Sequence, residues 1–350
     1  MLISTLAAIL SLSAQSGTTA CPGDAANCWQ EGEDIILANE ADAEFLMPYL
    51  QMARQRFETL HGFEAPKAAI VFDDIDHQDL SDAGYSVILP WFLPWQREAR
   101  IRSAIEAGVR GQTAGLGLSE DRIQAMIAQG AAAAGLSNDD DDGEPRDLVA
   151  GGAMHELGHL WLIHAYDWPT SSDDRNFYGV ETAPDWMDEV AAVLLENDGL
   201  TAGRRNHLRS VLNGEDRGEI VPLNIYFSID HPLLNATSRR AETMRAAAEA
   251  GARGQQTQVL VLSGEEADEM LAGADGMDPT LFYSQSRGFI DYVGARSGGE
   301  QYFVDAALAV LDGQVFAEWH EANAARYSLP VAMDMLEADW RSWLTQSYGR

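Results

Sequence analysis

The motif His155-Glu156-Leu157-Gly158-His159 has the HExxH spacing. On an α-helix, residues four apart lie on the same face, about 6 Å apart along the axis, so two imidazoles can bind one metal ion. Small and apolar residues surround the motif and predict a helix buried in a core. Buried imidazoles need partners, which a metal ion supplies. The motif therefore predicts a zinc site held by His155 and His159.

The third ligand has to come from elsewhere, because a catalytic zinc site usually has three protein ligands and one open position. His164 lies five residues after His159, about 140° around the helix, which does not suit a ligand. It is expected at the helix end or beside the ligands.

A second segment, 183–196, offers a carboxylate. Pro184 and Asp185 suit the start of a helix, and the following residues are mainly apolar, so this helix is also expected to be buried. A buried Glu189 needs a cation, which makes it the expected third ligand. Glu196, seven residues later, remains the alternative ligand or a group that supports one. The other alternative is a Glu189 that faces solvent or pairs with an arginine.

These two motifs carry a resemblance to a known family. HExxH followed by Trp186-x-x-Glu189-x-x-Ala192 resembles the gluzincin zinc metallopeptidases, and more narrowly the peptidase MA-like group, which is related to the catalytic domain of the gluzincin aminopeptidases. Val190 stands where the family usually has glycine. The resemblance covers roughly residues 30–345, and the two motifs are its specific part.

The resemblance implies a thermolysin-like architecture, a catalytic Zn²⁺ bound by His155, His159 and Glu189, and Glu156 as general base. The segment 281–293 resembles the family's later helix, whose tyrosine points at the metal and donates a hydrogen bond to the developing oxyanion. Tyr283 matches that tyrosine. The alternative is a core tyrosine at a helix start. The Gly-x-Met-Glu-Asn element of the aminopeptidases has no counterpart, so amino-terminal trimming is not implied.

Charge and the N-terminal residues bear on location and partners. The net charge of -32 argues against nucleic acid and anionic membranes as partners. Residues 1–16 resemble an export signal, with an apolar run and small residues around position 16. No apolar run reaches the length of about 18 residues that a membrane span needs. Cys21 and Cys28 can close a small disulfide loop in an oxidising compartment. We therefore expect a periplasmic or extracellular protein.

The order of elements predicts an α+β fold with two lobes. Residues 17–146 are expected to form an α/β lobe with a small mixed sheet, and residues 147–350 a mainly helical lobe that binds zinc. The active-site cleft is expected between the lobes, with the HExxH helix as its floor. Expected strands lie at 33–38, 67–72 and 85–89. Helices are expected at 42–61, within 98–135, and at 235–252, 263–271, 281–296, 300–312, 315–326 and 330–346. The acidic stretch 138–143 lacks the final glutamate of a calcium loop and is expected to be a linker.

The sequence thus favours an exported zinc-dependent metallopeptidase that hydrolyses peptide or protein substrates. Glu156 takes a proton from a zinc-activated water and returns it to the leaving amine, while Tyr283 stabilises the oxyanion. Two alternatives remain. One is a catalytically silent zinc- or peptide-binding module of the same fold, and the other is a structural protein in which HExxH is accidental. Substrate preference, endo- or exopeptidase action and oligomeric state are not specified by the sequence.

Overall fold

The computed structural model describes residues 27–72, 77–91, 94–113, 117–133, 146–169, 183–216, 218–232 and 278–349. The N-terminal elements are β1 Cys28–Glu31, β2 Asp34–Leu37, α1 Glu40–His61, β3 Ala68–Val71, α2 His77–Asp82, β4 Val87–Pro90, α3 Pro94–Thr113 and α4 Glu120–Ala133. The C-terminal elements are α5 Arg146–Tyr166, α6 Asp185–Leu195, α7 Asp198–Leu212, α8 Leu223–Tyr226, α11 Pro279–Ser297, α12 Gln301–Leu311, α13 Phe316–Asn323, the 3-10 helix η1 Ala324–Tyr327 and α14 Met333–Tyr348. The chain is mostly helical with one small sheet, which agrees with the expected α+β class.

The sheet is mixed, as expected, and has the strand order β1-β2-β3-β4. β1 and β2 form an antiparallel hairpin, whereas β2, β3 and β4 run parallel. The hairpin turn contains Gly32 at a φ of 60°, a conformation that glycine adopts without steric cost. Because side chains alternate along a strand, Ile36 and Ile70 face α1 and α5, while Ile35 and Val71 face α2. The three strands predicted from the sequence match β2, β3 and β4, and β1 is an addition.

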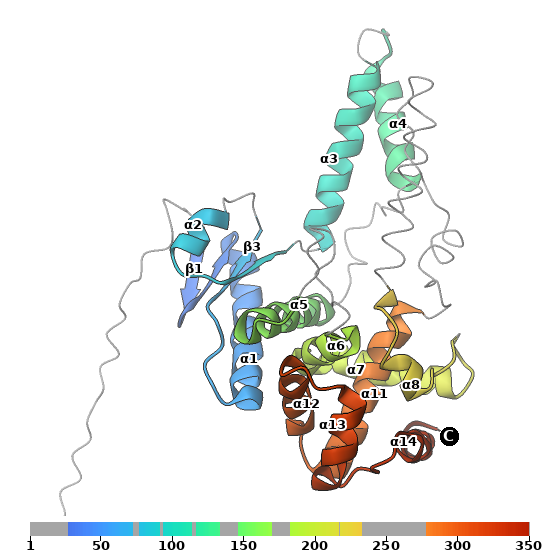
Figure 1. Ribbon diagram of the computed structural model, residues 1–350. Coiled ribbons are helices and arrows are strands. Elements are labelled where there is room, and N and C mark those ends of the chain that lie inside the picture. The colour runs from blue at the N-terminus through green and yellow to red at the C-terminus, as the bar shows by residue number, and fades with distance from the viewer. Residues whose placement is uncertain are drawn as a thin grey trace, which may run out of the picture.

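Helix α1 covers one face of the sheet (Figure 1). The Asn39 side chain caps its first turn by accepting from the backbone N–H of Asp42, and Gly62 ends it in the left-handed conformation. Arg54 of α1 makes a two-pronged ion pair with the fully buried Asp34 of β2. Helix and sheet are therefore joined by a charged pair as well as by apolar packing.

Helix α5, which contains HExxH, lies at the centre of the molecule between the sheet with α1 and the C-terminal helices (Figure 1). Met154, Leu157 and Trp161 of α5 belong to the core shared with α1 and the sheet, while Leu162 belongs to the core of the helical lobe. One helix thus supports both sides of the molecule. The division of the chain at residues 146 and 147 remains a prediction.

The C-terminal helices pack around an aromatic core (Figure 1). Its largest fully buried side chains include Trp186, Tyr226, Phe282, Phe289 and Trp340. The four helices expected after residue 280 correspond to α11, α12, α13 with η1, and α14, with bounds that differ by a few residues. The helices expected at 235–252 and 263–271, and the acidic stretch 138–143, lie outside the described residues.

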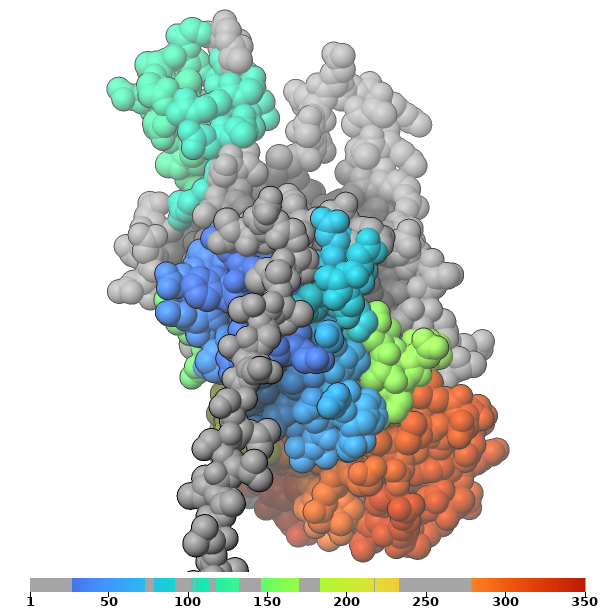
Figure 2. All heavy atoms as spheres, turned by 90° about the vertical axis from the view of Figure 1, so that its left-hand side faces the viewer, coloured from blue at the N-terminus to red at the C-terminus, as the bar shows by residue number. Residues whose placement is uncertain are grey.

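Helices α3 and α4 form a hairpin that stands away from the remaining elements, seen in teal in Figure 2. They account for the helical runs expected within 98–135. No helix among the described residues is long and apolar enough to cross a membrane. Cys28, at the start of β1, is disulfide-bonded, and the chain's other cysteine, Cys21, lies outside the described residues.

Candidate metal centre

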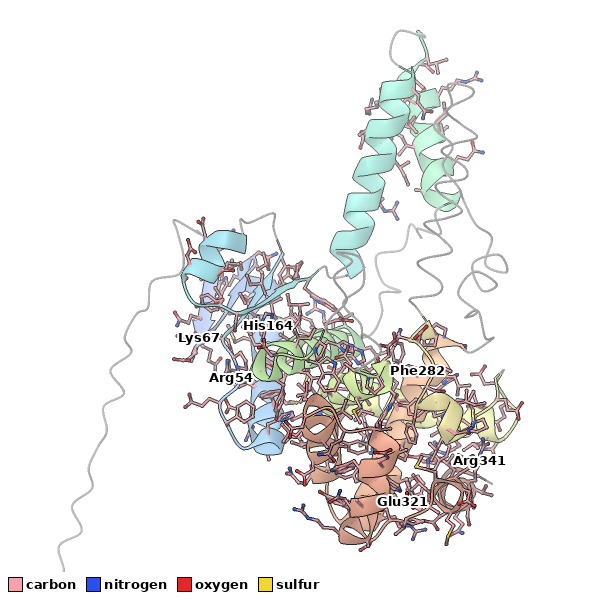
Figure 3. The ribbon with its side chains drawn as sticks, viewed as in Figure 1. Arg54, Lys67, His164, Phe282, Glu321 and Arg341 are labelled. Carbon is pink, nitrogen blue, oxygen red and sulfur yellow. The ribbon has the colours of Figure 1, made fainter. Side chains whose placement is uncertain are left out.

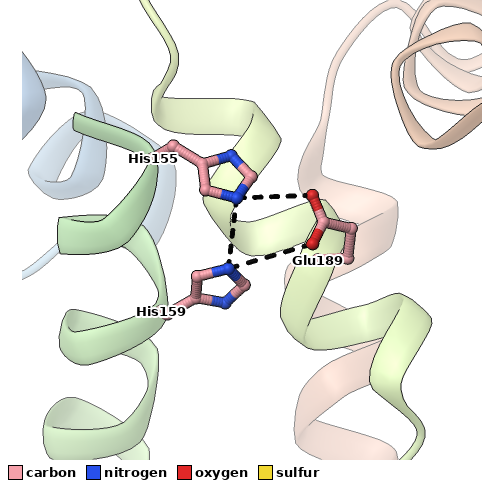
Figure 4. Close-up of side chains that lie close together, drawn as sticks. All are labelled: His155, His159 and Glu189. Atoms are coloured by element: carbon pink, nitrogen blue, oxygen red, sulfur yellow. Dashed lines mark hydrogen bonds and ion pairs between the residues drawn. The ribbon is translucent and has the colours of Figure 1, made fainter. Parts of the chain in front are cut away.

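The three ligands expected from the sequence lie together where α5 and α6 meet (Figure 4). The Nε2 atoms of His155 and His159 are 3.2 Å apart. One oxygen of Glu189 lies 3.5 Å from Nε2 of His155, and the other lies 3.8 Å from Nε2 of His159. All three side chains are buried, and Glu189 has no exposed surface. The sequence register therefore brings two imidazoles and one carboxylate to a single point.

The spacing of these atoms fits a bound metal ion. An ion held tetrahedrally at about 2.1 Å from each ligand places the ligand atoms about 3.4 Å apart, close to the measured separations. Within the part of the chain that the structure describes, neither oxygen of Glu189 accepts a well-aligned hydrogen bond, although Nε2 of His231 lies 3.3 Å from one of them. A buried carboxylate in that condition is costly unless a cation lies beside it. His155, His159 and Glu189 could therefore hold a metal ion.

The electrostatics of the cluster point the same way. Burial alone would raise the pKa of the Glu189 carboxyl, but the imidazoles around it, led by His155, lower that pKa to about 2. Burial alone would lower the pKa of His159, but the surrounding carboxylates, led by Asp188, raise that pKa to about 10. These carboxylates thus favour positive charge on or beside His159, and a metal cation can supply that charge instead of a proton.

A carboxylate lies against the outer nitrogen of each ligand histidine. Nδ1 of His155 is 3.0 Å from an oxygen of Glu196, and Nδ1 of His159 is 3.0 Å from an oxygen of Asp188. Arg204 donates to the same Glu196 oxygen. Such contacts fix the rotation of each ring and turn its Nε2 towards the metal position. Glu196 therefore lies behind His155 and is not in the group of converging ligand atoms, whereas Glu189 is.

Close contact between α5 and α6 sets the distance between the ligands. A Cβ atom on Gly158 would lie 2.6 Å from the Cα of Ala192 and 3.0 Å from the carbonyl oxygen of Ala191. Only glycine fits there, so the two helices touch backbone to backbone. Val190 stands at the position where gluzincins usually have glycine, and it packs into the core of the helical lobe. That departure is compatible with close packing, because Gly158 supplies the necessary space from the other helix.

The two residues expected to act on a substrate also lie at this site. Glu156 is half-buried on α5, and among the described residues no hydrogen bond or ion pair engages its carboxylate. The centres of the Tyr283 and His155 rings are 5.5 Å apart. The guanidinium of Arg204 lies over the Tyr283 ring, 4.5 Å from the ring centre. Burial, followed by the nearby carboxylates, raises the pKa of the Tyr283 phenol. This tyrosine therefore stays neutral and keeps a hydrogen to donate.

Three other residues complete the comparison with the sequence. His164 is exposed near the sheet and lies outside the ligand group (Figure 3), as its angular position on the helix predicted. Asp188 and His231, which approach His159 and Glu189, were not anticipated. Asp188 directly precedes Glu189, the predicted third ligand, so its position in the sequence could have marked it as part of the site. No local pattern marks His231.

Comparisons with protein-family models, curated proteins and solved structures found no match. The resemblance to gluzincins therefore rests on the residues of the two motifs and on Tyr283. Any function has to be argued from the chemistry of the site itself.

Proposed function

We propose that this chain is an exported zinc-dependent peptidase of the gluzincin type. The observation that carries the proposal is the convergence of two buried imidazoles and a buried carboxylate at separations that suit a tetrahedral ion. Among the described residues, none gives that carboxylate a well-aligned hydrogen bond. Two nitrogen ligands and one carboxylate are a common ligand set for catalytic zinc. Three protein ligands leave one position open for a water or a substrate oxygen.

The residues around the ligands support hydrolysis rather than simple metal storage. A bound Zn²⁺ would acidify a water molecule and polarise the carbonyl of a peptide bond. Glu156 is adjacent in sequence to His155, half-buried and without a hydrogen bond or ion pair among the described residues, so its carboxylate is suited to take a proton from water and pass it to the leaving amine. The hydroxyl of Tyr283 is suited to donate a hydrogen bond to the substrate oxygen as it gains negative charge. Metal binding alone requires neither residue.

Export is supported by three features of the chain. Residues 1–16 have the pattern of an export signal, Cys28 is disulfide-bonded, and the net charge of -32 suits a soluble secreted protein. The same charge argues against nucleic acid as a partner. We expect peptide or protein substrates in the periplasm or outside the cell.

The first experiment measures the metal content of the purified mature chain by elemental analysis, beside a His155→Ala/His159→Ala control. The expected result is about one zinc per chain in the wild type and none in the control. Absence of zinc from both proteins after reconstitution would reduce the motif to coincidence.

The second experiment tests catalysis with a library of peptides. The wild type should cleave members of the library, and Glu156→Gln should keep its zinc but lose cleavage, because an amide cannot accept the proton from water. A wild type that holds one zinc and cleaves nothing would support the alternative, a silent zinc- or peptide-binding module. Cleavage by Glu156→Gln at the wild-type rate would refute the general-base role.

A further inference from the structure

A third histidine, His231, lies against the candidate metal centre. It has no exposed surface, and its Nε2 is 3.3 Å from an oxygen of Glu189. Its ring meets Phe282 edge-on, with ring centres 5.1 Å apart, and lies 5.4 Å from the ring of Tyr283. His231 thus touches both a metal ligand and the proposed oxyanion donor.

The backbone of His231 fixes this ring relative to helix α6. Its N–H donates to an oxygen of Asp185 at 2.6 Å, and Asp185 is the first residue of α6. Glu189 follows one turn later, so residues 185 and 189 lie on the same face of that helix. His231 therefore contacts α6 at two carboxylates, and the position of its imidazole is tied to the helix that carries the third ligand.

The two oxygens of Glu189 have different surroundings. The one nearest His155 lies 3.5 Å from Nε2 of that residue, whereas the other lies between His159 and His231 at 3.8 and 3.3 Å. A carboxylate oxygen only accepts hydrogen bonds, so a favourable contact requires the hydrogen to be on Nε2 of His231. The first oxygen then remains free to face the ion.

We propose that His231 is a positioning residue for the zinc ligand Glu189. Its Nε2–H holds one carboxylate oxygen and leaves the other to bind the metal, so that the ligand arrives already oriented. The proposal rests on the proposed function only in taking the bound ion as zinc. His231 is distinct from the ligands, because the group whose ligand atoms all lie within 4.8 Å of one another contains only His155, His159 and Glu189 among the described residues.

The test is the zinc affinity of purified variants, measured by competition with a chromophoric chelator and therefore independent of peptide cleavage. His231→Leu removes the donor while filling the space, and His231→Gln retains an N–H near the same place. Loss of a partner behind a metal ligand usually weakens binding about 10- to 100-fold, so we expect that loss in His231→Leu. His231→Gln should recover to within about threefold of the wild type.

A matched control separates positioning from stability. His320, like His231, has no exposed surface. Its ring is hydrogen-bonded to the hydroxyl of Tyr302 and to the carbonyl of Pro330, and it belongs to the helical lobe away from the ligands. His320→Leu should lower the thermal midpoint without changing zinc affinity. A folded His231→Leu with wild-type affinity would overturn the proposal, as would equal weakening in the Leu and Gln variants.

Two further outcomes separate this proposal from the proposed function. A loss of affinity in His231→Leu as large as in Glu189→Ala, together with a Co²⁺ spectrum in the wild type that shows four protein ligands, would make His231 a ligand and overturn its positioning role. If His231→Leu binds zinc more weakly than the wild type, and the wild type itself cleaves no peptide, the positioning role would be supported and the peptidase function refuted. A wild type that binds no zinc would refute both.

Discussion

Replacement of Gly158 by alanine tests the packing that brings the ligands together. The added Cβ would lie 2.6 Å from the Cα of Ala192, about 1 Å inside ordinary van der Waals contact, and the atom it meets is backbone. The two helices must therefore separate by about 1 Å or distort. Overpacking of this kind costs about 1–3 kcal/mol, and alanine returns up to about 1 kcal/mol through its helix propensity. With the full helix-propensity gain subtracted, we expect a net loss of up to about 2 kcal/mol in the free energy of unfolding.

The same displacement should weaken zinc binding. Gly158 directly precedes His159 on α5, and Ala192 lies three residues after Glu189 on α6, so separation of the helices moves the imidazoles away from the carboxylate. Ligand distances in a zinc site are held to within about 0.2 Å, and a shift several times larger should reduce zinc affinity at least about tenfold. Urea denaturation gives the stability change, and chelator competition gives the affinity change.

Gly203→Ala is the matched control. Gly203 is also inside a helix, α7, but nothing lies within 4 Å of the position that its Cβ would take. This substitution should stabilise the protein by about 0.5–1 kcal/mol and leave zinc affinity unchanged. If Gly158→Ala matched Gly203→Ala in both measurements, the backbone contact between α5 and α6 would be refuted.

The other predictions concern the ligands, the proposed donor and acid stability. Glu196→Gln should lower zinc affinity about 10- to 100-fold, and Glu189→Ala should lower it further. Chelator competition measures both affinities. A larger loss in Glu196→Gln than in Glu189→Ala would make Glu196 the ligand. Tyr283→Phe should lower kcat about tenfold or more while zinc content stays at the wild-type level, and unchanged turnover would contradict a donor role. Burial lowers the pKa of His61 to about 4 in the folded chain. Between pH 6.5 and pH 4, His61 is therefore protonated in the unfolded chain but mostly neutral in the folded chain. Stability should therefore fall as the pH drops through that window, by about 2 kcal/mol at pH 5, and His61→Gln should remove this part of the fall in urea denaturation at pH 7.5 and pH 5.

Local patterns carried most of the fold prediction. The apolar periodicity of α11, α12 and α14 and the proline and acid at the start of α6 are signals that act within one or two helical turns, so they can be read without knowledge of the tertiary structure. β1 was missed because its four residues are half exposed and lack the β-branched character of its neighbours. Its pairing with β2 depends on the turn at Gly32.

The ligands of the candidate site could be predicted because each lies in a local motif. Residues 155 and 159 come together through helix geometry alone, and Glu189 was marked by its buried helix. His231 could not be predicted from a local motif. Its contact with Glu189 is a tertiary contact between residues more than forty positions apart in the sequence. The contact of Asp188 with His159 depends on how closely α5 and α6 cross, which the motifs do not state.

The residues behind the ligands bear on whether HExxH is accidental. Asp188, Glu189 and Glu196 are buried carboxylates with at most 1% exposure, and among the described residues Arg204 forms an ion pair with Glu196. These four groups together carry two net negative charges in the interior, and such charge is costly unless a proton on His159, whose pKa Asp188 and Glu189 raise, or a bound cation offsets it. A divalent cation at the convergence of the ligand atoms cancels both. An accidental motif would have no reason to gather these acids around its histidines, so the charge of the surroundings supports a metal centre in addition to the motif.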